Sequence, residues 1–370
     1  MSFPPLAFHV EPERGWLNDP NGLCYFGGKY HAYYQHNPTA TVWTAPLSWG
    51  HAVSEDLLHW EPAPIALSPD MPYESTGGCF SGSAYVEEGK IWFYYTAVGE
   101  DGAQTQCLAT SEDGYHLEKY PGNPILTGGP IDPTGRDFRD PKVFRWSDGS
   151  YRMVCGTGYE GRAAVVLYKS QDKLSWEYAG ILFETRDMGP VLECPDLYPI
   201  EDKWVLCFSR MDQPQRVTFL VGDFDGERFT PESVQHPAVG PNFYAPQSFL
   251  DPQGRRLVLG WMTPWGAPED PDPVRSGCLT VPLEVTLDDA GTLCLFPVEE
   301  ADSLLQKEDP CLRQGEWLFQ ITDGKKLLLE RPAREVWDAR VLADTHTREV
   351  FINGGEQYCS FFLEPDAFQN

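Results

Sequence analysis

The sequence predicts an all-β protein: a five-bladed β-propeller followed by a small β lobe. Three observations support this fold class. Short strand-like runs dominate the chain, one kind of turn returns with a period of roughly 50 residues, and the composition changes after Pro297. Long amphipathic helical patterns are scarce, and one short helical candidate covers residues 299–307.

Strands are expected wherever short runs of β-branched or aromatic residues are bounded by Gly, Pro, Asn or Asp. Seven runs before Pro297 have this form: residues 23–25, 30–34, 91–97, 163–168, 204–209, 217–221 and 257–261.

The recurring turn places an acid a few residues before an aromatic residue or a leucine. It occurs at residues 54–60, 111–117 and 170–176, and more faintly at 222–229. A period of this length with several short strands in each repeat is typical of propeller blades. Residues 1–297 have room for five blades. Coincidence is the alternative, because Ser-x-Asp turns are common, but three matched copies argue against it.

The composition divides the chain into three segments. We expect the propeller over residues 1–297, an acidic and polar linker over 298–316, and the small β lobe over 317–370. Strands are predicted in the lobe at 317–321, 326–329, 339–342, 349–352 and 358–363. Residues 353–355, Asn-Gly-Gly, are a hairpin signal.

The charge and the ends of the sequence limit the choice of partner and compartment. A formal net charge of −27 argues against nucleic acid and anionic membranes and suits a small neutral ligand, although solubility alone would also explain it. The N-terminus has no export signal and no apolar run reaches about 18 residues, so we expect a cytoplasmic protein that does not span a membrane.

The ten cysteines are expected as reduced thiols. No His/Cys cluster has zinc-ligand spacing, so neither a metal nor another cofactor is expected. The oligomeric state is left open.

Three acids stand beside prolines in separate motifs: Asp19 in residues 16–22 (WLNDPNG), Asp140 in 138–141 (FRDP) and Glu193 in 193–196 (ECPD). Proline stiffens the backbone around each acid. A surface turn is the alternative for any one of these motifs. If the fold brings them together, rigidly held carboxyl groups are what cleavage of a glycosidic bond requires.

These three motifs resemble the signature blocks of glycoside hydrolase family 32, which contains invertases, fructanases and sucrose-6-phosphate hydrolases. Residues 34–38, 48–52, 80–83 and 244–247 match in family order. The resemblance implies a five-bladed propeller followed by a β-sandwich. The lobe here is short for that sandwich, although residues 338–340 and 349–355 resemble its closing strands. We therefore expect a shortened, sandwich-like lobe.

The resemblance also implies catalytic roles. Asp19 would be the nucleophile, Glu193 the general acid/base, and Asp140 a stabiliser of the transition state. The implied activity is that of a retaining exo-β-fructosidase, which releases terminal β-D-fructofuranosyl units from sucrose or short fructo-oligosaccharides through a covalent fructosyl-enzyme. Retaining cleavage needs one ionised and one protonated carboxyl group about 5–5.5 Å apart.

Further residues carry over as sugar contacts. Asn18 and Gln35 would bind hydroxyl groups, while Trp43, Phe80, Ser81 and Trp261 would shape the wall. Core packing is the alternative for each aromatic residue. Arg139 would keep Asp140 ionised or bias the titration of the acid cluster; a structural ion pair is the alternative.

Other activities stay open at this point. They are a sucrose-6-phosphate hydrolase or a fructosyltransferase of the same fold, an arabinosidase- or xylosidase-type propeller enzyme, and a non-catalytic sugar-binding protein. A phosphorylated substrate would need a basic pocket, for which the candidates are Lys29, Arg136 and Arg275.

Overall fold

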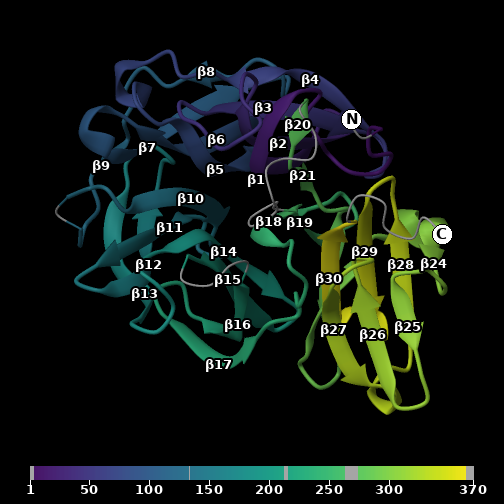
Figure 1. Ribbon diagram of the computed structural model, residues 1–370. Helices are drawn as coiled ribbons and strands as arrows, with labels where there is room; N and C mark the ends of the chain where they lie inside the picture. The colour runs from purple at the N-terminus through teal and green to yellow at the C-terminus, as the bar shows by residue number, and fades with distance from the viewer. Residues whose placement is uncertain (1–3, 133, 212–215, 263–273, 364–370) are drawn as a thin grey trace.

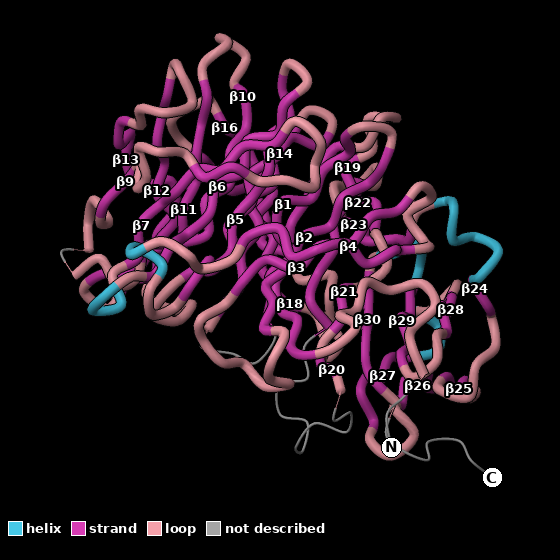
Figure 2. Tube along the Cα trace, turned by 90° about the horizontal axis from the view of Figure 1, so that it is seen from above, coloured by secondary structure: helices cyan, strands magenta, loops and turns pink. Residues whose placement is uncertain are grey.

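The protein is built almost entirely from β-strands arranged around an axis, with a lobe at one side (Figure 1). The computed structural model describes residues 4–132, 134–211, 216–262 and 274–363. Within these ranges the helices are five short 3₁₀ turns, two of which are η1 (Pro72–Glu74) and η2 (Glu100–Gly102) (Figure 2). None of the described helices is long and apolar enough to cross a membrane.

Five antiparallel sheets form the blades, and each sheet follows chain order outward from the axis. Blade 1 contains β1 (Gly15–Phe26), β2 (Lys29–Asn37), β3 (Ser48–Ser54) and β4 (Trp60–Leu67). Blade 2 contains β5 (Gly78–Glu87), β6 (Lys90–Val98), β7 (Gln104–Ser111), β8 (Glu118–Lys119) and β9 (Leu126–Thr127). Blade 3 contains β10 (Phe138–Arg145), β11 (Tyr151–Tyr159), β12 (Arg162–Ser170) and β13 (Glu177–Thr185).

Blade 4 contains β14 (Leu192–Ile200), β15 (Lys203–Arg210), β16 (Arg216–Phe224) and β17 (Phe229–Gln235). Blade 5 contains β18 (Tyr244–Leu250), β19 (Arg256–Met262), β21 (Cys278–Leu279), β22 (Leu283–Leu287) and β23 (Leu293–Pro297). All seven runs predicted as strands before Pro297 lie inside these elements, which confirms the predicted fold class for this part of the chain.

A short segment closes the ring of blades. Strand β20 (Arg275–Ser276) pairs in parallel with the start of β1, and β21 pairs antiparallel with β19. Residues 275–279 therefore connect the last blade to the first through backbone hydrogen bonds.

The structure explains the recurring turn. Each copy joins the third and fourth strands of one blade. In the three clear copies a serine and an aspartate cap the turn with side-chain hydrogen bonds. Ser54 Oγ donates to Asp56 Oδ1 at 3.1 Å, and Ser170 Oγ donates to Asp172 Oδ1 at 3.0 Å. In the faint copy Asp225 accepts from the backbone N–H of Arg228 at 2.7 Å. The sequence period is thus the period of the blades.

The lobe consists of two sheets around their own apolar core. One sheet contains β24 (Leu305–Gln306), β28 (Ala339–Ala343), β29 (Thr347–Ile352) and β30 (Gln357–Phe362); the other contains β25 (Leu312–Gln314), β26 (Leu318–Thr322) and β27 (Leu327–Pro332). Buried Phe319, Ile321, Val350 and Phe361 belong to one cluster between them. The remaining turns are η3 (Glu299–Leu304), η4 (Ala333–Glu335) and η5 (Asn353–Gly355).

The segment predicted as a linker, 298–316, contains η3, β24 and β25, and the two strands pair into the two sheets of the lobe. The helical candidate at 299–307 is the short turn η3. Residues 364–370 of the predicted lobe lie outside the described residues.

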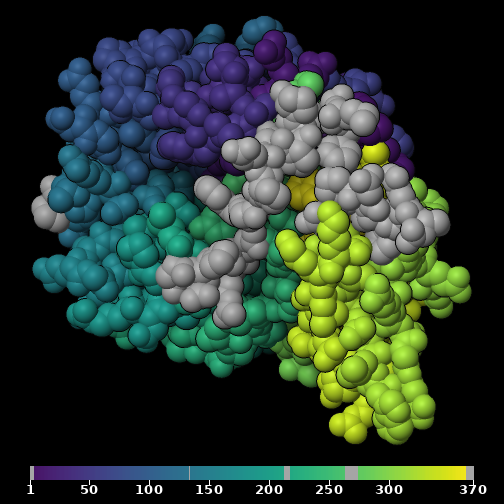
Figure 3. All heavy atoms as spheres, in the orientation of Figure 1, coloured from purple at the N-terminus to yellow at the C-terminus, as the bar shows by residue number. Residues whose placement is uncertain are grey.

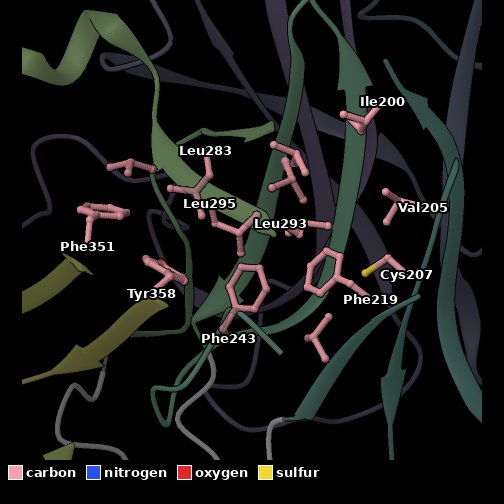
Figure 4. Packing of buried hydrophobic residues seen from close by; sticks show 14 of the residues in the cluster. Ile200, Val205, Cys207, Phe219, Phe243, Leu283, Leu293, Leu295, Phe351 and Tyr358 are labelled. Atoms are coloured by element: carbon pink, nitrogen blue, oxygen red, sulfur yellow. The ribbon is translucent and has the colours of Figure 1, made fainter. Parts of the chain in front are cut away.

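The lobe packs against blades 4 and 5 (Figure 3). Figure 4 shows the shared apolar cluster, to which Phe219 of blade 4, Phe243 beside blade 5 and Tyr358 of the lobe contribute. The backbone also joins the two parts, because the Val239 N–H donates to the Tyr358 carbonyl and the Tyr358 N–H donates to the Pro237 carbonyl, both at 2.8 Å.

A buried histidine holds the N-terminal segment against the lobe. His9 lies 2.8 Å from both Asp344 Oδ2 and Glu349 Oε1, and all three side chains are buried. Glu349 also accepts from the Val281 N–H at 2.9 Å and from the Tyr358 hydroxyl. Burial alone would lower the pKa of His9, but the hydrogen bonds and charges of its two carboxylate partners outweigh burial and raise it to about 9.

We expect His9→Ala to destabilise the protein by about 3–5 kcal/mol, because two buried carboxylates would lose their cation. The histidine's contribution should be complete below about pH 6.5 and lost as the pH rises through about 9, since its pKa is higher in the folded state. Denaturant unfolding from pH 6 to 10 should show that the difference in unfolding free energy between the parent and the variant decreases as the pH rises. His116→Ala, at an exposed site, is the control; a difference independent of pH would contradict the prediction.

Candidate active site

The innermost strand of every blade is interrupted at the same level by a β-bulge. The pairing register shifts between Leu17 and Pro20 in β1, Cys79 and Gly82 in β5, Arg139 and Lys142 in β10, Glu193 and Asp196 in β14, and Tyr244 and Gln247 in β18. Bulges bend a strand and re-aim its side chains, and they are frequent beside active sites.

Three of these bulges contain a non-glycine residue with positive φ followed by proline. The φ angles are 64° at Asp140, 49° at Cys194 and 48° at Ala245. Such conformations cost on the order of 1–3 kcal/mol and persist where the surroundings impose them. Proline donates no ladder hydrogen bond, so a bulge tolerates it. The three acid motifs of the sequence lie at the bulges of β1, β10 and β14.

A pocket of about 230 Å³ lies at this level. Its lining contains all ten predicted site residues: Asn18, Asp19, Gln35, Trp43, Phe80, Ser81, Arg139, Asp140, Glu193 and Trp261. It also contains Leu47, Met211 and Tyr244, which were not predicted as site residues. Residues from all five blades therefore meet around one cavity.

Asp19 is held by two hydrogen-bond donors. Ser81 Oγ donates to Asp19 Oδ2 at 2.6 Å, and Cys194 Sγ approaches the same oxygen at 3.5 Å. Burial raises the pKa of Asp19, and the charge of Glu193 raises it further, while hydrogen bonds from Ser81, Asn18 and Cys194 oppose the shift. One carboxylate oxygen is thus fixed by donors in the pocket wall.

Cys194 connects two of the acids. Its backbone N–H donates to Asp140 Oδ2 at 2.8 Å while its thiol contacts Asp19, and it directly follows Glu193. Burial raises the pKa of this thiol well above its usual range, and the nearby carboxylates raise it further. Cys194 therefore stays protonated as a donor and is no thiolate nucleophile.

Glu193 is positioned by one cation and one hydroxyl group. Arg139 donates to Glu193 Oε1 from Nη2 at 3.1 Å and from Nε at 3.3 Å, and the Tyr244 hydroxyl donates to Oε2 at 2.5 Å. Hydrogen bonds to both oxygens therefore fix the orientation of the Glu193 carboxyl group.

Arg139 contacts three carboxyl groups, of which the expected partner Asp140 is the most distant. It binds Glu193 and also Asp137, at 3.0 Å, whereas its Nε lies 4.0 Å from Asp140 Oδ2. Burial raises the pKa of Asp140 to about 7 although Arg139 lowers it, and the charges of Glu193 and Asp19 add to the increase. The sequence offered two interpretations, that Arg139 keeps Asp140 ionised or that it biases the titration of the acid cluster. The charge of Arg139 does lower the pKa of Asp140, but burial outweighs that effect.

Amide and aromatic side chains complete the wall. Gln35 Nε2 donates to the Cys79 carbonyl at 2.9 Å, while its buried Oε1 has no partner among the described residues. Asn18 Oδ1 accepts from Trp16 Nε1 at 2.7 Å. Trp43 is 46% exposed and stands edge-on to Phe80, whereas Trp261 is buried against Trp16. The pocket thus offers a free acceptor and flat apolar faces.

The sequence contains a pattern that could have identified Tyr244 as a site residue. Arg139, Glu193 and Tyr244 all stand two residues before a bulge proline, and all three point into the pocket. Leu47 and Met211 lie in loops after β2 and β15 and carry no comparable pattern.

The basic candidates for a phosphate site do not line the pocket. Lys29 pairs with Glu55 at 3.7 Å, Arg275 pairs with Glu11 at 3.3 Å, and Arg136 is exposed. Across the part of the chain that the structure describes, no group of three or more His, Cys, Asp or Glu side chains is arranged to hold a metal ion.

Comparison with known proteins identifies relatives over almost the whole chain. Residues 9–297 match the profile of the glycosyl hydrolases family 32 N-terminal domain. The chain is 39% identical to a sucrose-6-phosphate hydrolase of Escherichia coli over 437 residues, covering 97% of this chain and 89% of that protein. It is 38% identical to a raffinose invertase of Escherichia coli with the same coverage.

Solved structures agree with these matches. A mutant GH32 β-fructofuranosidase of Bombyx mori in complex with sucrose superposes with a TM-score of 0.84 at 27% identity, covering 98% of this chain and 89% of that chain. Fructan 1-exohydrolase IIa of Cichorium intybus superposes with a TM-score of 0.85 at 21% identity, covering 99% of this chain and 92% of that chain, and shows a shared fold.

Proposed function

Because this chain belongs to glycoside hydrolase family 32, we propose that its pocket releases terminal β-D-fructofuranosyl units from sucrose or short fructo-oligosaccharides. The chain is a glycoside hydrolase, and its relatives include sucrose-6-phosphate hydrolase, raffinose invertase and levanase. The observation that carries the proposal is the meeting of Asp19, Asp140 and Glu193 in one pocket.

The geometry supports distinct roles for the three acids. Asp19 attacks the anomeric carbon, since donors hold one of its oxygens. Glu193 transfers a proton to the leaving oxygen and later takes one from water. Asp140 binds hydroxyl groups of the fructosyl ring, and its raised pKa lets it donate or accept a hydrogen bond near neutral pH. The product keeps the configuration of the substrate, because two inversions follow each other.

The pocket suits a neutral sugar at its floor. Among the described lining residues the one cation, Arg139, is occupied by Glu193 and Asp137. A phosphate on the leaving sugar would have to bind outside the floor of the pocket. Exposed Arg136, in the loop before β10, is a candidate for that contact. The alternative activity, sucrose-6-phosphate hydrolysis, is favoured by relatives with that name.

Transfer of fructose to another sugar uses the same covalent intermediate and is a second alternative. We also propose a reducing, cytoplasmic location without nucleic-acid or membrane partners. All ten cysteines are free thiols, and nine of them are buried.

Product analysis with sucrose, sucrose 6-phosphate, kestose and inulin, side by side, tests the proposal. We expect release of fructose from sucrose and kestose, with inulin cleaved more slowly. A kcat/KM at least about tenfold higher for sucrose 6-phosphate would assign the phosphorylated substrate instead. Aryl arabinosides and xylosides serve as controls; cleavage of these without release of fructose would overturn the proposal.

A further inference from the structure

A second pocket lies at the opposite end of the propeller axis, and we call it the rear pocket. Its volume is about 560 Å³. It is lined by the later residues of the five innermost strands, together with residues that include Trp204 of β15 and Arg256 of β19. On β14, Glu193 reaches the active site and Tyr198 reaches the rear pocket. The two residues lie towards opposite ends of β14. The five innermost strands surround the axis in Figure 1.

Arg256 is a cation of this pocket that forms no direct ion pair. No carboxylate of the described residues forms an ion pair with it. Its guanidinium lies 5.1 Å from the centre of the Tyr198 ring, Nη1 donates to Ser248 Oγ at 3.4 Å, and buried Nε has no acceptor. Burial lowers the pKa of Arg256, although the charge of Asp196 opposes the shift. Burying a cation without an ion-pair partner costs free energy, and an anionic ligand would offset this cost.

The nearest acid, Asp196, is engaged through one oxygen only, and its buried Oδ1 has no hydrogen-bond partner among the described residues. Asp196 Oδ2 lies 3.0 Å from Lys142 Nζ and accepts from the Ser248 N–H at 2.7 Å. Lys142 also donates to the Ser248 carbonyl, and both residues line the rear pocket. Tyr198, beside Arg256, has a buried hydroxyl group with no partner among the described residues. Two polar groups of the rear pocket thus have unused hydrogen-bonding capacity.

The walls around these groups are largely aromatic. Phe144, Trp146 and Trp204 lie against one another, with ring centres 5.5–5.7 Å apart for Trp204 with Trp146 and Phe144. They are partly buried. Flat apolar faces beside a guanidinium suit a ligand whose ring carries an anionic group. The volume lies within the range of small-molecule sites.

We propose that the rear pocket binds a hexose phosphate, with its phosphate on Arg256 and Tyr198 and its sugar ring against the aromatic wall. A guanidinium presents paired N–H donors that match phosphate oxygens. The formal net charge of the chain is −27, so general attraction of anions cannot account for binding here. Recognition depends on Arg256, the cation of this pocket that forms no direct ion pair.

Calorimetric titration of the full-length protein with glucose 6-phosphate tests the proposal. Arg256→Gln should weaken binding at least tenfold, while kcat/KM for sucrose stays within about twofold. Arg162→Gln removes an arginine on the outer part of blade 3 and should leave binding unchanged. Glucose and inorganic phosphate are the comparison ligands, and each should bind at least tenfold more weakly than glucose 6-phosphate.

A steric variant covers the case in which Arg256→Gln does not fold. Leu250 lines the rear pocket and is 54% exposed, so Leu250→Trp should fold and narrow the pocket. It should also reduce binding of glucose 6-phosphate at least tenfold. Unchanged binding in both variants would overturn the rear site, and equal binding of inorganic phosphate would overturn its assignment to a sugar phosphate.

Discussion

Asp19→Asn should abolish release of fructose from sucrose, with a loss in kcat on the order of 10⁴-fold or more. The amide keeps the size of the side chain but cannot attack the anomeric carbon. Folding should survive, because the substitution removes a charge that burial already disfavours at Asp19 and that adds to the raised pKa of Asp140. Initial rates and thermal unfolding of the purified variant measure both effects.

Asp137→Asn is the matched control for Asp19→Asn. Asp137 contacts Arg139, at 3.0 Å, but does not line the pocket. It should lose less than about tenfold in kcat, as expected for a partner that only helps to hold Arg139. Activity of Asp19→Asn within tenfold of the parent would remove Asp19 from the reaction.

Glu193→Gln should slow cleavage by a factor that depends on the leaving group of the substrate. A general acid contributes about 10²–10⁴-fold, and most where the leaving oxygen is strongly basic. We therefore expect a loss on that scale with sucrose and a much smaller loss with 4-nitrophenyl β-D-fructofuranoside, whose leaving group needs little protonation. Steady-state rates with both substrates provide the test.

Tyr244→Phe separates proton transfer from positioning. It removes the 2.5 Å hydrogen bond to Glu193 Oε2 but leaves the acid in place. Both substrates should then slow by a similar, smaller factor. The same fractional loss for both substrates in Glu193→Gln would contradict its role as the acid.

Local chemistry explains why the propeller could be predicted from sequence. In the three clear copies a serine and an aspartate bond to each other and to the backbone of the turn, and in the faint copy the aspartate alone does so. In the strands between the turns, apolar residues either alternate with polar ones or form an unbroken run. These patterns are long enough to be recognised in the sequence. Strands β24 and β25 have only two and three residues, too few to show a period, which is why residues 298–316 were predicted as a linker.

The acids could be located from sequence, but their electrostatics could not. Proline fixes the backbone beside each acid, and this is visible in the chain itself. The pKa of Asp140 depends instead on burial by other blades and on the distance to Arg139. The choice of Glu193 as the partner of Arg139 follows from the spacing of two neighbouring blades. Such distances are properties of the assembled ring.

The pairing of β20 with β1 makes activity depend on completed synthesis. The strand that bears Asp19 leaves the ribosome first, yet the segment that fixes its beginning, residues 275–276, is made much later. A nascent chain shorter than this has every acid but an unsecured first blade. Premature termination or proteolysis before residue 279 should therefore yield an inactive fragment, even though Asp19, Asp140 and Glu193 are all present in it.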